Sequence, residues 1–307
     1  MTTLYYTHTS MLEHNTGGGH PERPDRLRSV WEALEARDFA ALDRHEAPFA
    51  DLVPILRVHP QSHIDAVMAA IPKEGRAKID ADTVVSAGSR EAALRAVGAV
   101  TAAVDSVIAG EGRNAFCAIR PPGHHAEPDR AMGFCLFNNV AIAAMQARER
   151  GLRRIAVVDF DVHHGNGTEA FFAPETGLFY ASTHQSPFYP GTGNRSQNSP
   201  GRIVNVPIAR GRGSDAFRGA FTGDILPALR AFEPEFLIIS AGFDAHRDDP
   251  LANLELDEDD FVWVTTELKR VAGDRCAGRI VSVLEGGYDL DALAASCAAH
   301  VRVLMEA

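Results

Sequence analysis

The segment D-F-D-V-H-H-G-N-G, residues 159–167, places a carboxylate and an imidazole two residues apart. On an extended segment such side chains leave the same face, so Asp161 and His163 can share a metal ion. A catalytic zinc site usually has three protein ligands and an open position. Asp244, in A-G-F-D-A-H, is the natural third ligand, and His246 is a competitor for that place.

Asp161 has a second interpretation, because aspartate is favoured as a helix cap after a strand. Capping does not explain the polar cluster around it, which comprises Asp159, His163, His164 and Asn166. We therefore favour metal binding. His164 faces away from His163 on an extended segment, and we expect it to pack or to bond to backbone.

A tandem histidine pair occurs in R-P-P-G-H-H-A, residues 120–126. Two prolines and a glycine form a stiff turn, so His124 and His125 have little freedom left to lose. Imidazole titrates near neutral pH and suits proton transfer. A His-His pair in a loop is often a surface accident, but the rigid turn and its position after a strand favour function.

The segment L-E-G-G-Y, residues 284–288, is the third element. Gly286 and Gly287 allow the backbone to approach a ligand closely. The Tyr288 hydroxyl can donate a hydrogen bond to an oxyanion. A strand-to-helix turn with a packed tyrosine is the alternative interpretation.

Short apolar runs between these motifs predict buried strands. Their hydrophobicity is continuous, which is typical of parallel strands covered on both faces. The predicted strands are Ala115–Ile119, Ile155–Phe160, Leu178–Ser182, Ile203–Val206, Phe236–Ser240 and Ile280–Leu284. The predicted helices are Ser89–Ala109, Asn138–Arg150, Ser214–Phe232, Asp257–Ala272 and Leu290–Met305.

Strand and helix alternate from about residue 80 onward, which predicts a single α/β domain over residues 1–307 with a mostly parallel sheet. Four of the predicted strands are each followed directly by acids, histidines or a tyrosine. Ligands of such sheets bind beyond the carboxyl ends of the strands. The sequence therefore predicts one site at that edge.

The net charge of −11 argues against a broad basic face for nucleic acid or for anionic membranes. We expect no signal peptide, because MTTLYYTHTS has neither a basic start nor an apolar run. We also expect no membrane helix, because no apolar stretch reaches the roughly 20 residues required. The four cysteines, expected to be reduced core residues, are Cys117, Cys135, Cys276 and Cys297. These features predict a soluble cytoplasmic protein.

Together the motifs resemble the zinc-dependent histone deacetylase family, which includes acetylpolyamine amidohydrolases and has an arginase-like α/β fold with helices on both faces of the sheet. The resemblance runs from H-N-T-G-G-G-H-P-E-R-P-D-R-L, residues 14–27, to E-G-G-Y, residues 285–288. R-P-P-G-H-H, G-F-C-L-F-N-N, D-V-H-H-G-N-G and G-F-D-A-H occur between them in this order. H-P-E-R-P and Asn166 are similar to the class II branch, since class I usually has Asp at the latter place.

The resemblance implies zinc on Asp161, His163 and Asp244. Hard oxygen ligands do not select zinc strongly, so ferrous iron is also compatible with this set. Tyr288 is implied to polarise the acyl carbonyl. The implied reaction is hydrolysis of an N-acyl amide, which releases acetate in the simplest case and a free amine.

The resemblance also implies that His124 and His125 act on the attacking water and the leaving amine. Asp159 is implied to orient His124, and Asn166 to lie behind His125. A carboxylate behind an imidazole favours the protonated ring more than a neutral amide does. We therefore expect His125 to be the neutral general base and His124 to be more cationic.

Members of the family bind a potassium or sodium ion near the metal. The resemblance assigns this ion to the side chains of Asp159 and Asp161, the His163 carbonyl, Ser182 and Thr183. The residues implied to contact the substrate are Gly133, Phe134, Phe188, Tyr189, Leu251, Asp82, Gly286 and Gly287. Phe188 is the alternative to Tyr189 in the wall of the acyl tunnel, and Asp80 is the weaker alternative to Asp82 at its rim.

Two substrates are compatible with this resemblance, an acetylated lysine peptide and a small acetylated amine such as a polyamine. Polyamine deacetylases can carry a Glu after the third zinc ligand, where this chain has Leu251 in D-D-P-L. An apolar side chain there favours acetyl-lysine. A ureohydrolase with two manganese ions is disfavoured because a second set of acids is missing, and an inert acyl-binding protein is disfavoured because His124, His125 and Tyr288 are intact.

Overall fold

The computed structural model describes residues 2–306. Eight strands form one sheet in which each neighbouring pair is parallel, in the order β2-β1-β5-β10-β9-β6-β7-β8. The strands are β1 (Thr3–Thr7), β2 (Asp43–Glu46), β5 (Asn114–Cys117), β6 (Ile155–Asp159), β7 (Leu178–Gln185), β8 (Ile203–Ile208), β9 (Phe236–Ala241) and β10 (Ile280–Leu284). β3 (Arg76–Lys78) and β4 (Val84–Ser86) form a separate antiparallel pair.

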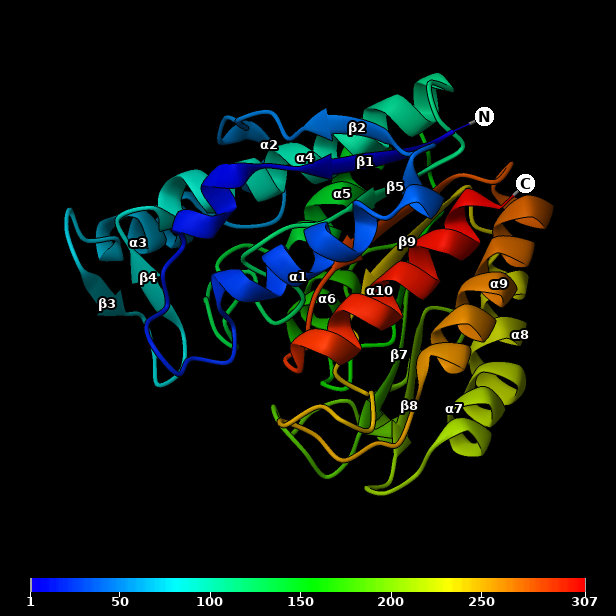
Figure 1. Cartoon of the computed structure of the whole chain (residues 1–307). Helices are drawn as coiled ribbons and strands as arrows, with labels where there is room; N and C mark the ends of the chain where they lie inside the picture. The colour runs from blue at the N-terminus through cyan, green and yellow to red at the C-terminus, as the bar shows by residue number, and fades with distance from the viewer. Residues whose placement is uncertain (1, 307) are drawn as a thin grey trace.

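Helices cover both faces of the sheet (Figure 1). α1, α9 and α10 lie on one face, and α4, α5 and α6 lie on the other. The α-helices are α1 (Pro24–Leu34), α2 (Val53–Leu56), α3 (Gln61–Ala70), α4 (Ser89–Ala109), α5 (Asn139–Glu149), α6 (Asn166–Phe172), α7 (Ser214–Ala220), α8 (Leu226–Phe232), α9 (Glu258–Arg275) and α10 (Leu290–Met305). Short helical turns are η1 (Thr9–Glu13), η2 (Arg37–Phe39), η3 (Arg195–Gln197) and η4 (Phe221–Ile225). The predicted fold class is therefore confirmed.

The central strands are apolar along their whole length because helices pack on both sides of them. Every residue of β6, β9 and β10 is buried. A parallel sheet with both faces covered gives this continuous pattern rather than an alternating one. The continuous apolar runs were therefore a reliable signal for these strands.

The predicted helix starts agree with the caps that the structure contains. The Asp257 side chain accepts from the backbone of the first turn of α9, and Asp260 returns a bond to the Asp257 backbone. Asn138 caps α5 and Asp289 caps α10 in the same way. Each cap satisfies backbone donors that the first turn of a helix leaves free.

The helix expected over Ser214–Phe232 is present with the predicted bounds, but it is not regular throughout, because the π-helical turn Phe221–Ile225 separates α7 from α8. Pro227 at the start of α8 has no backbone N–H, so the regular ladder cannot continue through it. Several elements were not predicted, among them the strands β1 and β2. β2 is a short edge strand with the polar sequence D-R-H-E, which carries no apolar pattern.

The expectation that no stretch is long and apolar enough for a membrane helix was wrong. α4 spans 21 residues and meets both criteria, and 61% of its most apolar window is buried in the protein. It packs against α5 and the strands β1 and β5. Its apolar character is thus explained by packing in the core.

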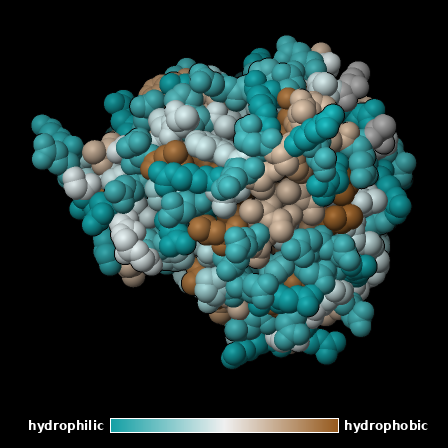
Figure 2. Space-filling view, viewed as in Figure 1, coloured by the Kyte–Doolittle hydropathy of each residue, from teal (hydrophilic) through white to brown (hydrophobic). Residues whose placement is uncertain are grey.

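The surface seen in Figure 2 is mostly hydrophilic, with pale brown residues gathered over α10. Within α10, Ala294, Ala295 and Ala298 are not fully buried. All four cysteines are buried and free, as expected.

The two ends of the fold are in contact, because the Thr3 hydroxyl donates to the Leu304 carbonyl at 3.2 Å.

The topology gathers the polar motifs at one edge of the sheet. The segments that follow β5, β10, β9, β6 and β7 carry them, and these five strands are consecutive neighbours in the sheet. Because the strands are parallel, all five carboxyl ends lie on the same side.

Candidate active site

Asp161, His163 and Asp244 come together just beyond β6 and β9. All three are buried, and one ligand atom from each lies within 4.8 Å of the others. His163 Nδ1 lies 3.1 Å from Asp161 Oδ1 and 3.1 Å from Asp244 Oδ2. The structure thus brings together the three residues that the sequence singled out as metal ligands.

Glycines and backbone donors hold the two carboxylates in place. A Cβ atom at Gly286 would overlap the carboxylates of Asp161 and Asp244, and one at Gly242 would overlap that of Asp161. The Gly286 N–H donates to Asp161 Oδ2 at 2.8 Å, and the Val162 N–H donates to Asp244 Oδ1 at 2.8 Å. Both carboxylates are therefore oriented by the backbone before any ion binds.

The electrostatics of this cluster fit a bound cation. Burial lowers the pKa of His163, but the two neighbouring carboxylates outweigh burial and raise it to about 10. Burial, together with the nearby Asp161, raises the pKa of Asp244 to about 7. Two buried carboxylates require compensation by a proton or a metal ion, and an Asp/His/Asp donor set fits a divalent metal ion.

His124 is held by Asp159, and the carboxylates around it favour its protonated form. Its Nδ1 lies 3.0 Å from Asp159 Oδ2. Burial lowers the pKa of His124, but Asp161 and Asp159 outweigh burial and raise it to about 10. Its Nε2 lies 3.8 Å from Asp161 Oδ1, so the imidazolium adjoins the candidate metal centre.

The surroundings of His125 favour its neutral form. Its ring centroid lies 4.0 Å from that of His124, and its Nδ1 lies 2.8 Å from Asn166 Oδ1. Burial and the cationic His124 and His163 hold the pKa of His125 well below its usual value. A neutral ring that donates from Nδ1 keeps a free lone pair on Nε2.

Tyr288 lies against Phe134 and Arg26. Its ring centroid is 5.9 Å from that of Phe134 and 4.9 Å from the Arg26 guanidinium carbon. The Tyr288 N–H donates to Asp249 Oδ2 at 2.7 Å. Burial raises the pKa of the Tyr288 hydroxyl well above its usual range, so this group remains a hydrogen-bond donor.

A buried ion network supports the segment that carries Tyr288. Arg26 donates to the carbonyls of Glu285 and Gly287 and pairs with Glu22 at 3.2 Å. Arg120 donates to the other Glu22 oxygen at 2.8 Å. Burial raises the pKa of Glu22, but Arg120 outweighs burial and holds it at about 2. Removing one partner from such a network typically costs about 3–5 kcal/mol.

Five supporting residues were not assigned a role from the sequence: Glu22, Arg26, Arg120, Asp249 and Glu285. The Glu285 carboxylate accepts from the N–H groups of Gly123 and His124 at 2.7 and 3.2 Å and so fixes the histidine turn. All five lie within the quoted segments. The presence of charged residues inside those segments was the signal that could have identified them.

A cavity of about 90 Å³ leads to these groups. Five predicted substrate-contacting residues line it: Asp82, Gly133, Phe134, Tyr189 and Leu251. His125, His163 and Tyr288 complete the lining. Phe134 has a φ of 69°, a left-handed conformation, and its N–H donates to Thr83 at 3.1 Å. The loop after β5 is thereby tied to β3 and β4.

Three other predicted contacts do not line this cavity among the described residues. Phe188 stacks on His163 with centroids 5.3 Å apart, whereas Tyr189 lies against His125. Gly286 lies against the carboxylates of Asp161 and Asp244, and Gly287 lies against Leu293 and Phe243. At the rim, Asp82 lines the cavity, while Asp80 accepts from the backbone of its own turn.

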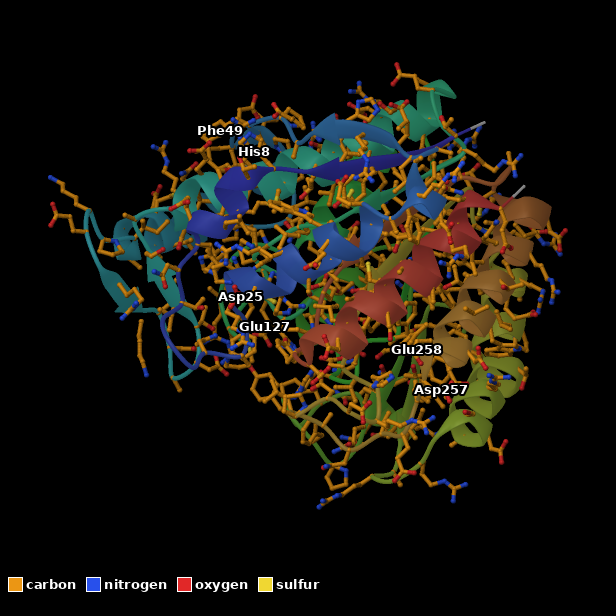
Figure 3. All side chains as sticks on the ribbon, in the orientation of Figure 1. His8, Asp25, Phe49, Glu127, Asp257 and Glu258 are labelled. Carbon is orange, nitrogen blue, oxygen red and sulfur yellow. The ribbon has the colours of Figure 1, made fainter. Side chains whose placement is uncertain are left out.

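Two histidines lie outside the metal cluster. His246 accepts from the Asp248 N–H and faces Glu258, which Figure 3 labels at the start of α9. It is therefore not a competitor for the place of Asp244. His164 packs in the interior as expected, with its ring centroid 4.8 Å from that of His184, and it also bonds to the side chains of Thr192 and Glu169 at 2.8 and 3.0 Å.

The residues named for a monovalent cation lie on adjoining strands. Asp159 of β6 pairs in register with Ser182 of β7, and Thr183 follows. The Asp159 carboxylate accepts from the Asp161 N–H at 3.1 Å and from the Tyr180 hydroxyl at 3.2 Å. The cation site stays a prediction.

Comparisons with known proteins agree with this geometry. Residues 20–304 match the Histone deacetylase domain family. The chain is 38% identical to "Histone deacetylase 14, chloroplastic" of Arabidopsis thaliana, across 98% of this chain and 76% of that protein. It is 39% identical to a "Histone deacetylase-like amidohydrolase" of Pseudomonas aeruginosa, across 88% of this chain and 73% of that protein.

A solved structure shares the fold. The crystal structure of the HDA15 HD domain superposes with a TM-score of 0.94 at 36% sequence identity. The match covers 99% of this chain and 90% of that chain.

Proposed function

This chain belongs to the histone deacetylase family and is a deacetylase, and from that premise we propose that it is a zinc-dependent enzyme that removes acetyl groups from lysine side chains. The observation that carries this proposal is the cavity of about 90 Å³, whose lining combines Phe134 and Leu251 with His163 and Tyr288. A narrow apolar passage that ends in polar groups suits an aliphatic chain with a terminal amide.

The residues of this chain supply the proton transfers of the proposed reaction. Asp161, His163 and Asp244 would hold the zinc ion, which would supply Lewis acidity toward the acyl carbonyl and the attacking water. The neutral His125 accepts the proton of that water on Nε2, because its Nδ1 is already bonded to Asn166.

The remaining groups act on the oxygen and nitrogen of the amide. The Tyr288 hydroxyl donates a hydrogen bond to the oxygen on which negative charge develops. The carbon–nitrogen bond then breaks, and the nitrogen takes up the proton from the histidine pair. The products are a carboxylate and a free amine. The cationic His124, held by Asp159 at 3.0 Å, stabilises negative charge beside the reaction.

Changing Asn166 to Asp is expected to move the acidic limb of the pH profile of kcat/KM to higher pH. Burial and the cationic His124 now hold the pKa of His125 well below 6.5. A carboxylate behind the Nδ1–H favours the imidazolium, so the base is lost at a higher pH, by about one pH unit. kcat/KM measured across the pH range tests this, and an unmoved acidic limb would show that His125 is not the base.

We also propose that a potassium or sodium ion binds beside this centre, with oxygens from Asp159, Asp161, His163, Ser182 and Thr183. The in-register pairing of Asp159 with Ser182 supports this placement. Such an ion would add positive charge beside buried carboxylates.

An acetylated polyamine is the second candidate substrate, and the carboxylate of Asp82 at the cavity favours it. Leu251 favours lysine, because an apolar side chain gives no recognition of a distal ammonium. The relatives named as deacetylases argue against the ureohydrolase alternative.

Comparison of kcat/KM on an acetyl-lysine peptide and on acetylated putrescine or spermidine tests the substrate proposal. We expect the peptide to be preferred by about tenfold, which corresponds to about 1.4 kcal/mol. A Leu251→Glu variant is expected to shift the ratio toward the polyamine. A wild-type preference for the polyamine would refute the lysine assignment, and absence of turnover on every acyl amide would refute the proposed enzyme.

A further inference from the structure

We propose that Glu127 is a positioning residue, which fixes the side-chain amide of Asn166 and thereby sets the tautomer of His125. This inference rests on the proposed role of His125 as general base. Figure 3 places Glu127 among the loops below α1.

The three side chains form a continuous chain of hydrogen bonds. Glu127 Oε1 accepts from Asn166 Nδ2 at 2.7 Å, and Asn166 Oδ1 lies 2.8 Å from His125 Nδ1. Asn166 is buried, and the Glu127 side chain is 26% exposed. The carboxylate therefore reaches inward from the surface to a buried amide.

The backbone holds Glu127 at this position. The Glu127 N–H donates to the Arg130 carbonyl at 2.9 Å, which closes a tight turn. The His59 ring lies 2.9 Å from the Pro128 carbonyl and accepts from the Asn138 N–H at 2.9 Å. The turn that carries Glu127 is therefore anchored on both sides.

The direction of these hydrogen bonds follows from the chemistry of Glu127. An ionised carboxylate only accepts hydrogen bonds, so Glu127 must face the amide nitrogen of Asn166. The amide oxygen then faces His125 and only accepts, so His125 Nδ1 must carry the proton. His125 Nε2 is left with the lone pair that a general base needs. If the Asn166 amide were reversed, the His125 proton would lie on Nε2. That nitrogen could then not accept a proton from the attacking water.

Three substitutions of Glu127 separate this role from others. Glu127→Gln keeps an acceptor and is expected to retain at least about half of the wild-type kcat. Glu127→Met removes the acceptor, so both amide orientations are populated and kcat falls about two- to fivefold. Glu127→Lys presents a donor, favours the reversed amide and is expected to lower kcat at least tenfold, with KM changed less than about twofold.

Arg130→Gln is the matched control. It removes the ion pair with Glu127 at 3.1 Å but leaves the contact with Asn166. We expect kcat of this variant within about twofold of the wild type. If Arg130→Gln reproduces the loss of Glu127→Lys, or if Glu127→Gln is as poor as Glu127→Lys, the inference is overturned.

The Asn166→Asp background tests the route of the effect. A carboxylate at position 166 has no orientation to be set, so Glu127→Lys should cost less than about twofold there at the pH of maximal activity. An equal loss in both backgrounds would mean that Glu127 acts on the loop rather than through Asn166.

A spectroscopic measurement separates this inference from the proposed function. Nitrogen-15 NMR of the metal-loaded wild-type protein should show His125 with its proton on Nδ1, and Glu127→Lys should increase the Nε2–H form. The spectrum of His125→Asn identifies the signals. This readout requires no turnover, so a wild-type ring protonated on Nε2 overturns the inference even in an active enzyme.

Discussion

Replacement of Asp244 by Asn is expected to abolish turnover by removing the metal. Asn is isosteric and can still accept from the Val162 N–H, which now lies 2.8 Å from Asp244 Oδ1. It lacks the negative charge that a divalent ion requires, and it leaves Asp161 and His163 as an incomplete site. We expect kcat/KM to fall at least about 10³-fold, which is about 4 kcal/mol. Steady-state kinetics and the metal content per chain test this.

His246→Asn is the matched control for this substitution. It makes a comparable change two residues away, on a side chain that faces Asp248 and Glu258. Metal content and kcat/KM should stay within about twofold of the wild type. If Asp244→Asn keeps its metal and a tenth of its activity, the three-ligand centre is refuted. Zinc added to a chelated wild-type protein should restore turnover, and restoration by ferrous iron alone would reassign the metal.

The sequence predicted those strands whose apolar pattern can be seen within a single short segment. β6, β9 and β10 read as continuous apolar runs because both of their faces are covered. β2 pairs at the edge of the sheet through backbone bonds, and its side chains D-R-H-E carry no such pattern. The π-helical turn between α7 and α8 precedes a single proline, Pro227, within an otherwise regular helical segment.

The candidate site divides in the same way. Residues that share one motif, such as Asp161 and His163, were found from their spacing, and Asp244 followed from the rule that strand ends meet at one edge. Glu22, Arg26 and Arg120 were not found. Glu22 lies 98 residues before Arg120, and no spacing rule joins two charges that meet only in the folded core.

Tyr288→Phe is expected to lower kcat about 10²- to 10³-fold with little change in KM. The hydroxyl is the only atom removed, and one donor to a developing oxyanion is typically worth about 3–4 kcal/mol. The ring contacts with Phe134 at 5.9 Å and with Arg26 at 4.9 Å would remain, so substrate binding in the ground state should persist. Initial-rate kinetics on the acetyl-lysine peptide separate the two parameters.

Tyr5→Phe is the matched control for loss of a tyrosine hydroxyl. Tyr5 lies on β1, and its buried hydroxyl has no hydrogen-bond partner among residues 2–306. Its kcat should equal that of the wild type within about twofold, since no reacting atom lies near. A fall in KM parallel to kcat for Tyr288→Phe would instead indicate that the hydroxyl raises the free energy of the bound substrate and does not lower that of the transition state. An unchanged kcat for Tyr288→Phe would show that the hydroxyl does not stabilise the oxyanion and would refute the role of Tyr288.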